Sequence, residues 1–432
     1  MSYVGRTLRK EVDQMLGFVT RRFVVLSAFI IFSSFAVYSD AQAQSEWPQW
    51  GGPSRDFVSK SKGLAASWPQ TGPKQLWNRD LGQGHSAIIV DGKTLYTMYS
   101  VGEQEVVVAL AADTGKTIWE YKYDAPTAGI DYEYGLAPHS TPLLVGDLLY
   151  TVGGVGKFHA LDKKSGKVVW SHDLYKDLGG RKMGRGYSCS PIAYKNTVIT
   201  TLGGAGQTYV AFNQKDGKVV WKNANLDMSP ASPVIVTVDG QAQLIAFMGK
   251  VIAGLDPNNG EVLWTHPHVT DWGLNITTPV WGNDNLLFLS SAYSGGSRVL
   301  KLTRAGGKTN VSELWFNNRL RIHHTTAIRI GDYVYGTSGD FGPAFFAGVN
   351  IKTGEVAFQD RSFPKSNLLY ADGKLIILDE DGNLALATVS PTGLKVISKT
   401  SVLKNLAWTV PTLVGSKLYV RDRKTIAAFD LS

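Results

Sequence analysis

The chain has 432 residues, of which 44% are hydrophobic and 19% charged, so it is long enough to bury a large core. Its 46 glycines, 17 prolines, 18 tyrosines and 12 tryptophans are typical of many short strands joined by tight turns, and they indicate an all-β protein. The net charge is +8, but lysines and acidic residues are interspersed without a run of five like charges, which argues against nucleic-acid binding.

The N-terminal segment has the features of an export signal. A pair of arginines precedes an apolar run at residues 23–38, and small residues at 41–43 then surround a possible cleavage site. We therefore expect residues 1–43 to be a signal peptide that directs the protein to the periplasm, with translation starting at Met15. An uncleaved membrane anchor is the alternative, although a full span needs about 20 apolar residues.

Residues 47–56 have the sequence WPQWGGPSRD and follow the predicted signal. The side chains of Trp47 and Trp50, and of Trp68 in a second WPQ, could stack on a ligand ring or fill a space in the core. Because residues 44–73 lie outside the repeats described below, we predict that they form an N-terminal strap that packs across the fold.

A repeat that ends in an aromatic residue runs through the rest of the chain. Clear copies such as ALDKKSGKVVW, and weaker ones after them, end at Trp119, Trp170, Trp221, Trp264, Trp315, Phe358 and Ile397. GPKQLW, which ends at Trp77, lacks the first half of the repeat, and the last residues of the chain, IAAFDLS, lack the second half. Each copy has an apolar strand, a polar turn in which Asp or Asn precedes Gly, and a second apolar strand, which predicts a β-hairpin.

A second repeat alternates with the first and also has eight copies. Each has a hydroxyl or small residue, a short apolar strand, a turn and another apolar strand, as in HSTPLLVGDLLYT from residue 139. Two hairpins make four strands, the content of one propeller blade, so the sequence predicts an eight-bladed β-propeller of four-stranded blades over residues 74–432. Residues 74–80 should supply the outer strand of the blade whose other strands come from 407–431, which closes the ring.

The pattern A-x-D-x-x-[ST]-G-x-x-x-W resembles the tryptophan-docking repeats of quinoprotein-like propellers, the pyrroloquinoline quinone (PQQ) repeat family, over nearly all of residues 47–431. The resemblance implies that each tryptophan packs between neighbouring blades and donates a hydrogen bond from its indole N–H. On this basis the structural docking residues are Trp77, Trp119, Trp170, Trp221, Trp264 and Trp315. The family includes PQQ-dependent alcohol and glucose dehydrogenases and a non-enzymatic outer-membrane protein assembly lipoprotein, so the fold alone does not select the function.

Features of both groups are missing from this chain. Many of the dehydrogenases hold PQQ and a calcium ion on the propeller axis beside two adjacent cysteines, whereas Cys189 is the only cysteine here. The same count leaves the chain without the lipid-bearing cysteine of the assembly lipoprotein and without an intramolecular disulfide. We therefore assign no cofactor and no metal, and we keep PQQ with calcium as the alternative.

The segments that lead from each outer strand to the next inner strand should emerge on one face, and three of them, at 121–138, 171–187 and 265–275, are long. We hypothesise that polar and aromatic side chains near the inner-strand starts converge on the axis and form a funnel for an anionic or metal-bearing ligand. The candidate ligand-binding residues are His85, His139, Arg185, Tyr187, Asn275, Arg321, His323 and Trp408. The alternative is that these loops simply carry polar residues.

Two glycine-containing segments are predicted to be ordinary turns. GGVGK at 153–157 lacks the Ser or Thr and the following helix of a phosphate-binding loop, and DPNNG at 256–260 occupies the turn of the first repeat. The sequence as a whole favours an exported, monomeric, non-catalytic scaffold that binds an envelope protein or a small ligand. The alternative is a PQQ-dependent dehydrogenase that oxidises an alcohol or sugar. We expect no nucleic-acid partner, and no membrane contact beyond the signal or an uncleaved anchor.

Overall fold

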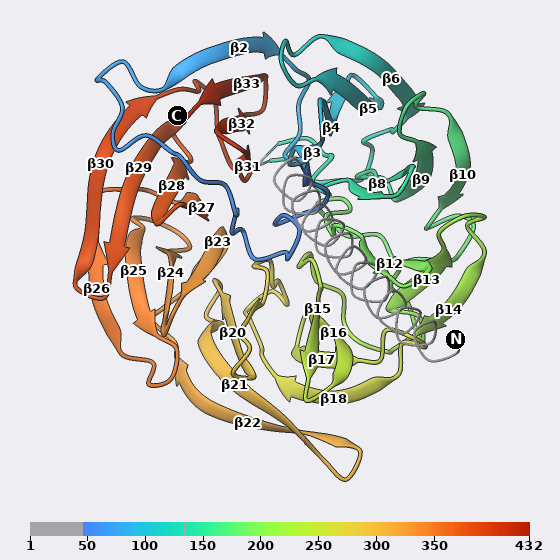
Figure 1. Ribbon diagram of the computed structural model, residues 1–432. Helices are drawn as coiled ribbons and strands as arrows, with labels where there is room; N and C mark the ends of the chain where they lie inside the picture. The colour runs from blue at the N-terminus through green and yellow to red at the C-terminus, as the bar shows by residue number, and fades with distance from the viewer. Residues whose placement is uncertain (1–45, 134) are drawn as a thin grey trace, which may run out of the picture. The chain divides into compact units, whose positions relative to one another are not determined.

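The computed structural model describes residues 46–133 and 135–432. These residues form eight antiparallel β-sheets arranged in a ring (Figure 1), so the predicted eight-bladed β-propeller is confirmed. The predicted signal peptide and the proposed start at Met15 lie outside the described residues. Within residues 46–133 and 135–432, no helix is long and apolar enough to cross a membrane.

Each sheet has an inner strand near the centre of the ring and an outer strand at the rim (Figure 1). The first four sheets consist, from inner to outer strand, of β3 (Ile89–Asp91), β4 (Thr94–Val101), β5 (Gln104–Ala111) and β6 (Thr117–Asp124); β7 (Leu143–Val145), β8 (Leu148–Val152), β9 (Lys157–Asp162) and β10 (Val168–Asp173); β11 (Ile192–Tyr194), β12 (Thr197–Thr201), β13 (Tyr209–Asn213) and β14 (Val219–Asn223); and β15 (Val234–Val238), β16 (Gln241–Phe247), β17 (Val251–Leu255) and β18 (Val262–Pro267).

The remaining four sheets continue the same order around the ring. They consist of β19 (Val280–Trp281), β20 (Leu286–Ser291), β21 (Gly296–Ala305) and β22 (Lys308–Asn317); β23 (Ile322–Ile330), β24 (Tyr333–Ser338), β25 (Phe345–Asn350) and β26 (Val356–Asp360); β27 (Ser366–Ala371), β28 (Lys374–Asp379), β29 (Asn383–Ser390) and β30 (Gly393–Ser401); and β31 (Thr412–Val414), β32 (Lys417–Arg421), β33 (Thr425–Asp430) and β2 (Lys74–Asp80).

The ring is closed by strands from the two ends of the described chain, as predicted. β2 pairs with β33, with Trp77 opposite Ala428. The fully buried Arg421 then joins the eighth sheet to the first, because its guanidinium donates to the carbonyl oxygens of Ser86 and Met98 at 3.1 and 2.7 Å. Burial lowers the pKa of Arg421 to about 10, so it stays protonated at neutral pH, and these carbonyl oxygens offset the cost of burying the charge.

Neighbouring sheets are in contact at the turn between the third and fourth strands of a sheet. In the second sheet, Asp162 accepts a hydrogen bond from the Ser165 backbone N–H at 2.8 Å, and Gly166 has a φ of +69°. The indole of Trp119, from the preceding sheet, lies on this glycine, and a Cβ there would come within 2.5 Å of the ring. Glycine is therefore required by its positive φ and by the indole together. The same contact joins Trp77 to Gly115, Trp170 to Gly217, Trp221 to Gly260 and Trp315 to Gly354.

The indole hydrogen bonds are less uniform than the family resemblance implies. Four tryptophans donate to a backbone carbonyl of the next sheet at 2.8–3.0 Å: Trp77 to Ala112, Trp119 to Lys163, Trp170 to Gln214 and Trp315 to Ile351. Trp264 instead donates to Gln243 Oε1 within its own sheet, and the Trp221 N–H has no acceptor among the described residues. The hairpin that follows Trp264 is the long β21–β22 pair, whose turn lies at Ala305–Lys308 and does not bring a carbonyl to this indole.

The segment before β2 crosses the centre of the ring. Its first two described residues form β1 (Glu46–Trp47), which pairs with β3 and makes the first sheet five-stranded rather than four-stranded. Trp50 Nε1 donates to Thr278 Oγ1 beside the fifth sheet at 2.8 Å, and the Ser59 N–H donates to Tyr370 O of the seventh. Because its partners belong to the first, fifth and seventh sheets, the segment lies across the centre of the ring (Figure 1).

Several side chains of this segment are buried, among them Arg55 and Trp47. Arg55 donates to the carbonyl oxygen of Pro191 at 2.9 Å, and burial lowers the pKa of Arg55 to about 10. Trp47 is 3% exposed, and a Cβ on Gly52 would come within 2.9 Å of its ring. Trp47 and Trp68 belong to the apolar cluster that joins the first, seventh and eighth sheets. Their contacts are therefore packing contacts at the seam of the ring.

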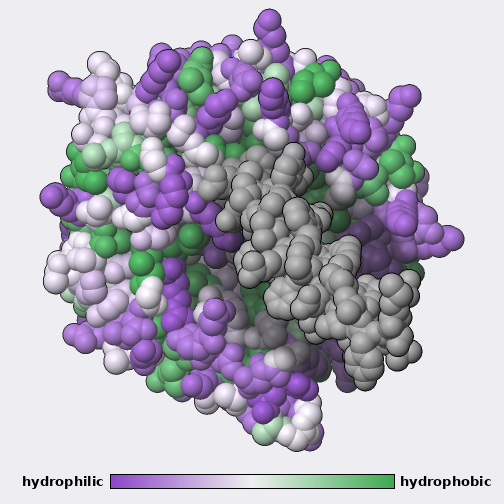
Figure 2. Space-filling view, in the orientation of Figure 1, coloured by the Kyte–Doolittle hydropathy of each residue, from purple (hydrophilic) through white to green (hydrophobic). Residues whose placement is uncertain are grey.

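The surface of the propeller is mostly polar. On the face shown in Figure 2, hydrophilic residues occupy most of the periphery, and hydrophobic residues occur in scattered groups between them. Among the described residues, the most exposed large apolar side chains are Phe341 at 69%, Val269 at 64% and Trp272 at 62%. All three lie in segments that connect strands, whereas other exposed apolar side chains, such as Ile118 and Val220, lie on outer strands.

Candidate functional site

Two kinds of connection meet on one face of the ring, which we call the loop face. In an up-and-down sheet the turn between the second and third strands and the segment that leads to the next sheet leave from the same end. The shorter turns, including those with the tryptophan contacts, lie on the opposite face. The loop face is where the sequence predicts the funnel, and its connections vary most in length.

Six aromatic and imidazole rings form a continuous chain on the loop face, and we call them the axial cluster. Consecutive ring centroids along this chain are 4.5–5.7 Å apart, in the order His139, His85, Trp408, His324, His323 and Tyr293. These rings belong to the second, first, eighth, sixth and fifth sheets. Sheets so far apart around the ring can touch only near its centre, so the cluster lies close to the propeller axis.

The hydrogen bonds of the axial cluster hold the rings in fixed orientations. Tyr293 O–H and His323 Nε2 are 2.7 Å apart, and Trp408 Nε1 donates to Glu380 Oε2 at 2.9 Å. Burial lowers the pKa of His139 and of His323 to about 4, and burial together with the neighbouring His323 lowers the pKa of His324 well below its usual value. These three imidazoles are therefore neutral at pH 7 and offer ring faces and hydrogen bonds, but no positive charge, to a ligand.

Four of the eight predicted ligand-binding residues, His85, His139, His323 and Trp408, meet in this cluster. Sequence reasoning did not place the other two members in the site. His324 is directly next to the predicted His323, so the HHTT motif already contained a signal for it. Tyr293 lies in the turn between β20 and β21 rather than at the start of an inner strand, so the repeat gave no reason to choose it.

Tyr187 and Asn275, in contrast, do not line a funnel. Tyr187 is 1% exposed, and its O–H is 2.9 Å from Thr201 Oγ1 inside the core between the second and third sheets. Asn275 is fully buried, and its side chain is hydrogen-bonded to the Met248 carbonyl and to the Ser291 hydroxyl. Both side chains satisfy buried polar groups of the fold.

The two predicted arginines form ion pairs on the loop face, beside the axial cluster. A backbone group of Arg185 is hydrogen-bonded to His139, and the Tyr293 N–H donates to Asp340 Oδ2 at 3.3 Å. Arg185 Nη2 is 3.3 Å from Asp131 and 3.6 Å from Glu133. Arg321 Nη1 is 3.2 Å from Asp340 Oδ2. Their charges are therefore paired with carboxylates of neighbouring loops.

Three aromatic side chains form a second feature, which we call the aromatic patch. Trp272, Tyr293 and Phe341 have ring centroids 4.9–5.8 Å from one another. Trp272 and Phe341 are mostly exposed, whereas Tyr293 also belongs to the axial cluster. Tyr293 has a φ of +53°, and its backbone is held by the Asp271 N–H, which donates to the Tyr293 carbonyl at 2.8 Å. A positive φ on a bulky residue stores strain, so the surrounding loops fix this patch in place.

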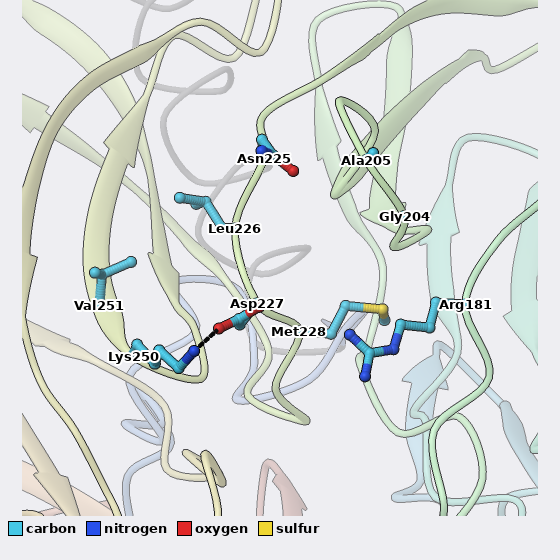
Figure 3. Close-up of a pocket in the computed structure, with 9 residues that line it drawn as sticks. All are labelled: Arg181, Gly204, Ala205, Asn225, Leu226, Asp227, Met228, Lys250 and Val251. Atoms are coloured by element: carbon cyan, nitrogen blue, oxygen red, sulfur yellow. Dashed lines mark ion pairs between the residues drawn. The ribbon is translucent and has the colours of Figure 1, made fainter.

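A cavity of about 380 Å³ opens between the third and fourth sheets. Figure 3 shows its lining residues, which are Arg181, Gly204, Ala205, Asn225, Leu226, Asp227, Met228, Lys250 and Val251. Lys250 Nζ is 2.8 Å from Asp227 Oδ2, and this pairing, with Arg181 nearby, lowers the pKa of Asp227. Arg181 lies beside Met228, on the other side of the 225–228 segment from Lys250 (Figure 3). The cavity thus has one paired carboxylate and two cations around an apolar side chain.

The described residues do not provide a ligand set for the calcium ion of a PQQ enzyme. Calcium takes six to eight oxygen ligands, most often from carboxylates and amides. Within residues 46–133 and 135–432, no group of three or more His, Cys, Asp or Glu side chains could hold a metal ion. Cys189 is fully buried, and burial raises the pKa of its thiol. We therefore derive no chemical step through PQQ.

Comparison with known proteins shows which family this chain is similar to. The sequence profile described as outer membrane protein assembly factor BamB matches residues 102–360. The BamB protein of Yersinia pestis is 26% identical over 235 residues, which cover 50% of this chain and 55% of that protein. The quinoprotein alcohol dehydrogenase PedH of Pseudomonas putida is 29% identical over 180 residues, which cover 40% of this chain and 26% of that enzyme. The matches therefore span about half and about a quarter of these two relatives.

A solved structure is similar over more of the chain. The crystal structure of BamB from Moraxella catarrhalis superimposes with a TM-score of 0.57 at 18% identity and covers 83% of this chain and 98% of that one. At this level of identity the similarity shows the propeller fold alone.

Proposed function

The chain belongs to the family of the outer membrane protein assembly factor BamB, and from this premise we propose that it is an exported, non-catalytic scaffold that binds a protein partner during outer membrane protein assembly. The location that goes with this role is the periplasm, reached through the signal peptide at residues 1–43. Residues 44–73 act as a strap that holds the ring closed, because the described part of this segment packs into the seam.

The observation that carries the proposal is the aromatic patch. Trp and Tyr are enriched among the residues that dominate protein–protein binding energy, since they bury large areas with few rotatable bonds. Trp272 and Phe341 are 62% and 69% exposed, so they lie on an open surface and not inside a pocket for a small molecule. The pinned backbone of Tyr293 means that little ordering is needed when a partner binds.

A polar rim surrounds the patch, as in many protein interfaces. Arg321 and Asp340 form an ion pair beside Phe341, and Asp271 accepts a hydrogen bond from Ser294 at 2.7 Å. These groups keep part of their surface exposed and can exchange solvent or intramolecular contacts for contacts with a partner. The patch and its rim therefore have the composition of an interface.

The test replaces the two exposed rings. In the source bacterium, deletion of the gene should lower the amount of folded outer membrane β-barrel proteins, measured by heat-modifiable mobility on gels. The wild-type chain and a Val220→Ser control, whose side chain is 51% exposed on β14, should restore that amount. A Trp272→Ser/Phe341→Ser chain that is equally abundant and folded should not. If the double variant fully restores the amount of folded β-barrel protein, the aromatic patch is not the binding surface. If deletion of the gene leaves that amount unchanged, the proposed function is wrong.

The alternative, a PQQ-dependent dehydrogenase that oxidises an alcohol or sugar, is favoured by the similarity to PedH. It requires that the purified protein retain PQQ in the presence of calcium and reduce a dye when an alcohol or sugar is added. Retained quinone absorbance together with turnover would replace the scaffold proposal. A protein that neither retains quinone nor reduces dye leaves the scaffold as the function.

A further inference from the structure

A second cavity lies away from the aromatic patch and from the axial cluster. Its volume is about 610 Å³, within the usual range for small-molecule sites. It lies at the loop-face end of the second sheet, between the connections that precede and follow this sheet, and we call it the lysine pocket. Its lining residues are Pro126, Ala128, Gly129, Ile130, Gly154, Val155, Lys157, Asp173, Tyr175, Lys176, Lys182 and Met183.

The GGVGK segment forms one wall of this pocket. Residues 153–156 form a turn between β8 and β9, as the sequence predicts. A hydrogen bond to the buried carboxylate of Glu105 holds this turn in place. Glu105 is 2% exposed; its Oε1 accepts the Gly154 N–H at 2.8 Å and its Oε2 accepts the Tyr123 O–H at 2.7 Å. The turn is therefore held by hydrogen bonds from the first sheet and does not depend on a ligand.

The opposite wall is equally well defined. Asp173 Oδ1 accepts the backbone N–H groups of Tyr175 and Lys176 at 3.1 and 3.0 Å, and the Leu174 N–H donates to the Gly156 carbonyl at 2.9 Å. A Cβ on Gly156 would come within 2.6 Å of the Tyr175 ring, so this glycine allows the two walls to approach each other. The cavity is thus part of the folded framework.

The charges in the pocket are unbalanced. Lys157, Lys176 and Lys182 line it, and the only carboxylate among its lining residues is that of Asp173, which is engaged by the two backbone N–H groups. Within the described part of the chain, none of these three ammonium groups forms an ion pair. Lys157 Nζ donates to the carbonyl oxygen of Asp124, at 2.9 Å. An anion would supply the missing negative charge.

The rest of the lining is apolar. Ile130, Val155 and Met183, with the ring of Tyr175, provide a surface on which an unbranched or aromatic carbon skeleton can be buried. We propose that the lysine pocket binds a small amphiphilic anion, in which a carboxylate or phosphate group faces the three lysines and an apolar body lies against these side chains. A free fatty acid and a lysophospholipid both have this chemistry.

Isothermal titration calorimetry of the purified full-length protein tests this proposal with four probes, each below its micellar concentration. They are laurate, lysophosphatidylglycerol, the neutral dodecanol and inorganic phosphate. At least one of the two amphiphilic anions should bind at least tenfold more tightly than dodecanol and than phosphate, and the one that binds identifies the head group. Binding of neither anion, or equal binding of dodecanol or phosphate, would overturn the proposal.

Variants then connect binding to this pocket. Lys157→Gln/Lys182→Gln should weaken binding of the anion at least tenfold, and Ile130→Ser should weaken it several-fold. Lys164→Gln/Lys215→Gln, at exposed turn positions on the opposite face, is the matched control and should leave the affinity unchanged. Circular dichroism and thermal unfolding confirm that each variant is folded. Unchanged affinity in folded Lys157→Gln/Lys182→Gln protein would show that the anion binds elsewhere and would reject the site.

Discussion

The two faces of the propeller follow different rules. On the face opposite the loop face, which we call the turn face, nearly the same hairpin is repeated around the ring. There a tryptophan of one sheet lies on a glycine of the next in five places. On the loop face the connections differ from sheet to sheet, and they carry the axial cluster, the aromatic patch and both cavities. The regular face holds the ring together, and the irregular face is free to carry function because the ring does not depend on its details.

The largest effect on stability should come from the turn face. Gly217→Ala places a methyl group 2.6 Å from the Trp170 ring at a φ of +68°, so we expect a loss of about 3 kcal/mol or more in the free energy of unfolding. Gly92→Ala is the control, because Gly92 has a φ of +56° with no atom within 4 Å, and it should cost only about 1–2 kcal/mol. Urea unfolding measures both. Equal losses would show that the indole contact adds nothing to backbone strain.

The next largest effect concerns pH and the loop face. The folded-state pKa of about 4 for His139 and His323 lies below their ordinary value of 6.5, so the unfolded chain binds protons first. Stability is therefore full above about pH 6.5 and is lost as the pH falls toward 4, by at most roughly 3 kcal/mol for each histidine. Urea unfolding of the wild type and of His139→Gln and His323→Gln across this range checks the prediction. The variants should have a shallower pH dependence, and an identical slope would contradict it.

A smaller effect compares two tryptophans on the turn face. Trp170→Phe removes a hydrogen bond to the Gln214 carbonyl, whereas Trp221→Phe removes an indole N–H that has no acceptor among the described residues. Both lose similar ring area, so Trp170→Phe should cost about 1 kcal/mol more than Trp221→Phe. Thermal and urea unfolding of the pair measures the difference. Equal costs would mean that the inter-sheet hydrogen bond contributes nothing beyond packing.

The smallest effect on stability should come from the aromatic patch. Trp272→Ser/Phe341→Ser removes two exposed rings, so the free energy of unfolding should change by less than about 1 kcal/mol. The same variant should fail to restore outer membrane protein assembly, so stability and function separate on the loop face. A large loss of stability would show instead that the patch belongs to the packing of the fold.

The candidate site was predictable only in part. His85, His139, His323 and Trp408 precede or begin inner strands, and the repeat places that position near the axis. Tyr187 and Asn275 occupy comparable positions, but their side chains turn inward to satisfy buried hydroxyl and carbonyl groups. The sequence repeat predicts where the backbone lies, whereas the direction of a side chain depends on the groups that pack around it.

The sequence by itself determined the number of blades, the hairpins and the strand that closes the ring. These depend on local features, since a glycine at positive φ and alternating apolar residues specify a hairpin without reference to distant parts of the chain. Only the tertiary structure decided which loop residues meet. The contacts of Trp408 with His85 and His324 and the patch around Tyr293 join segments that are far apart in the chain. Those segments are neighbours only because eight sheets pack into a ring, and ring closure is a property of the whole chain.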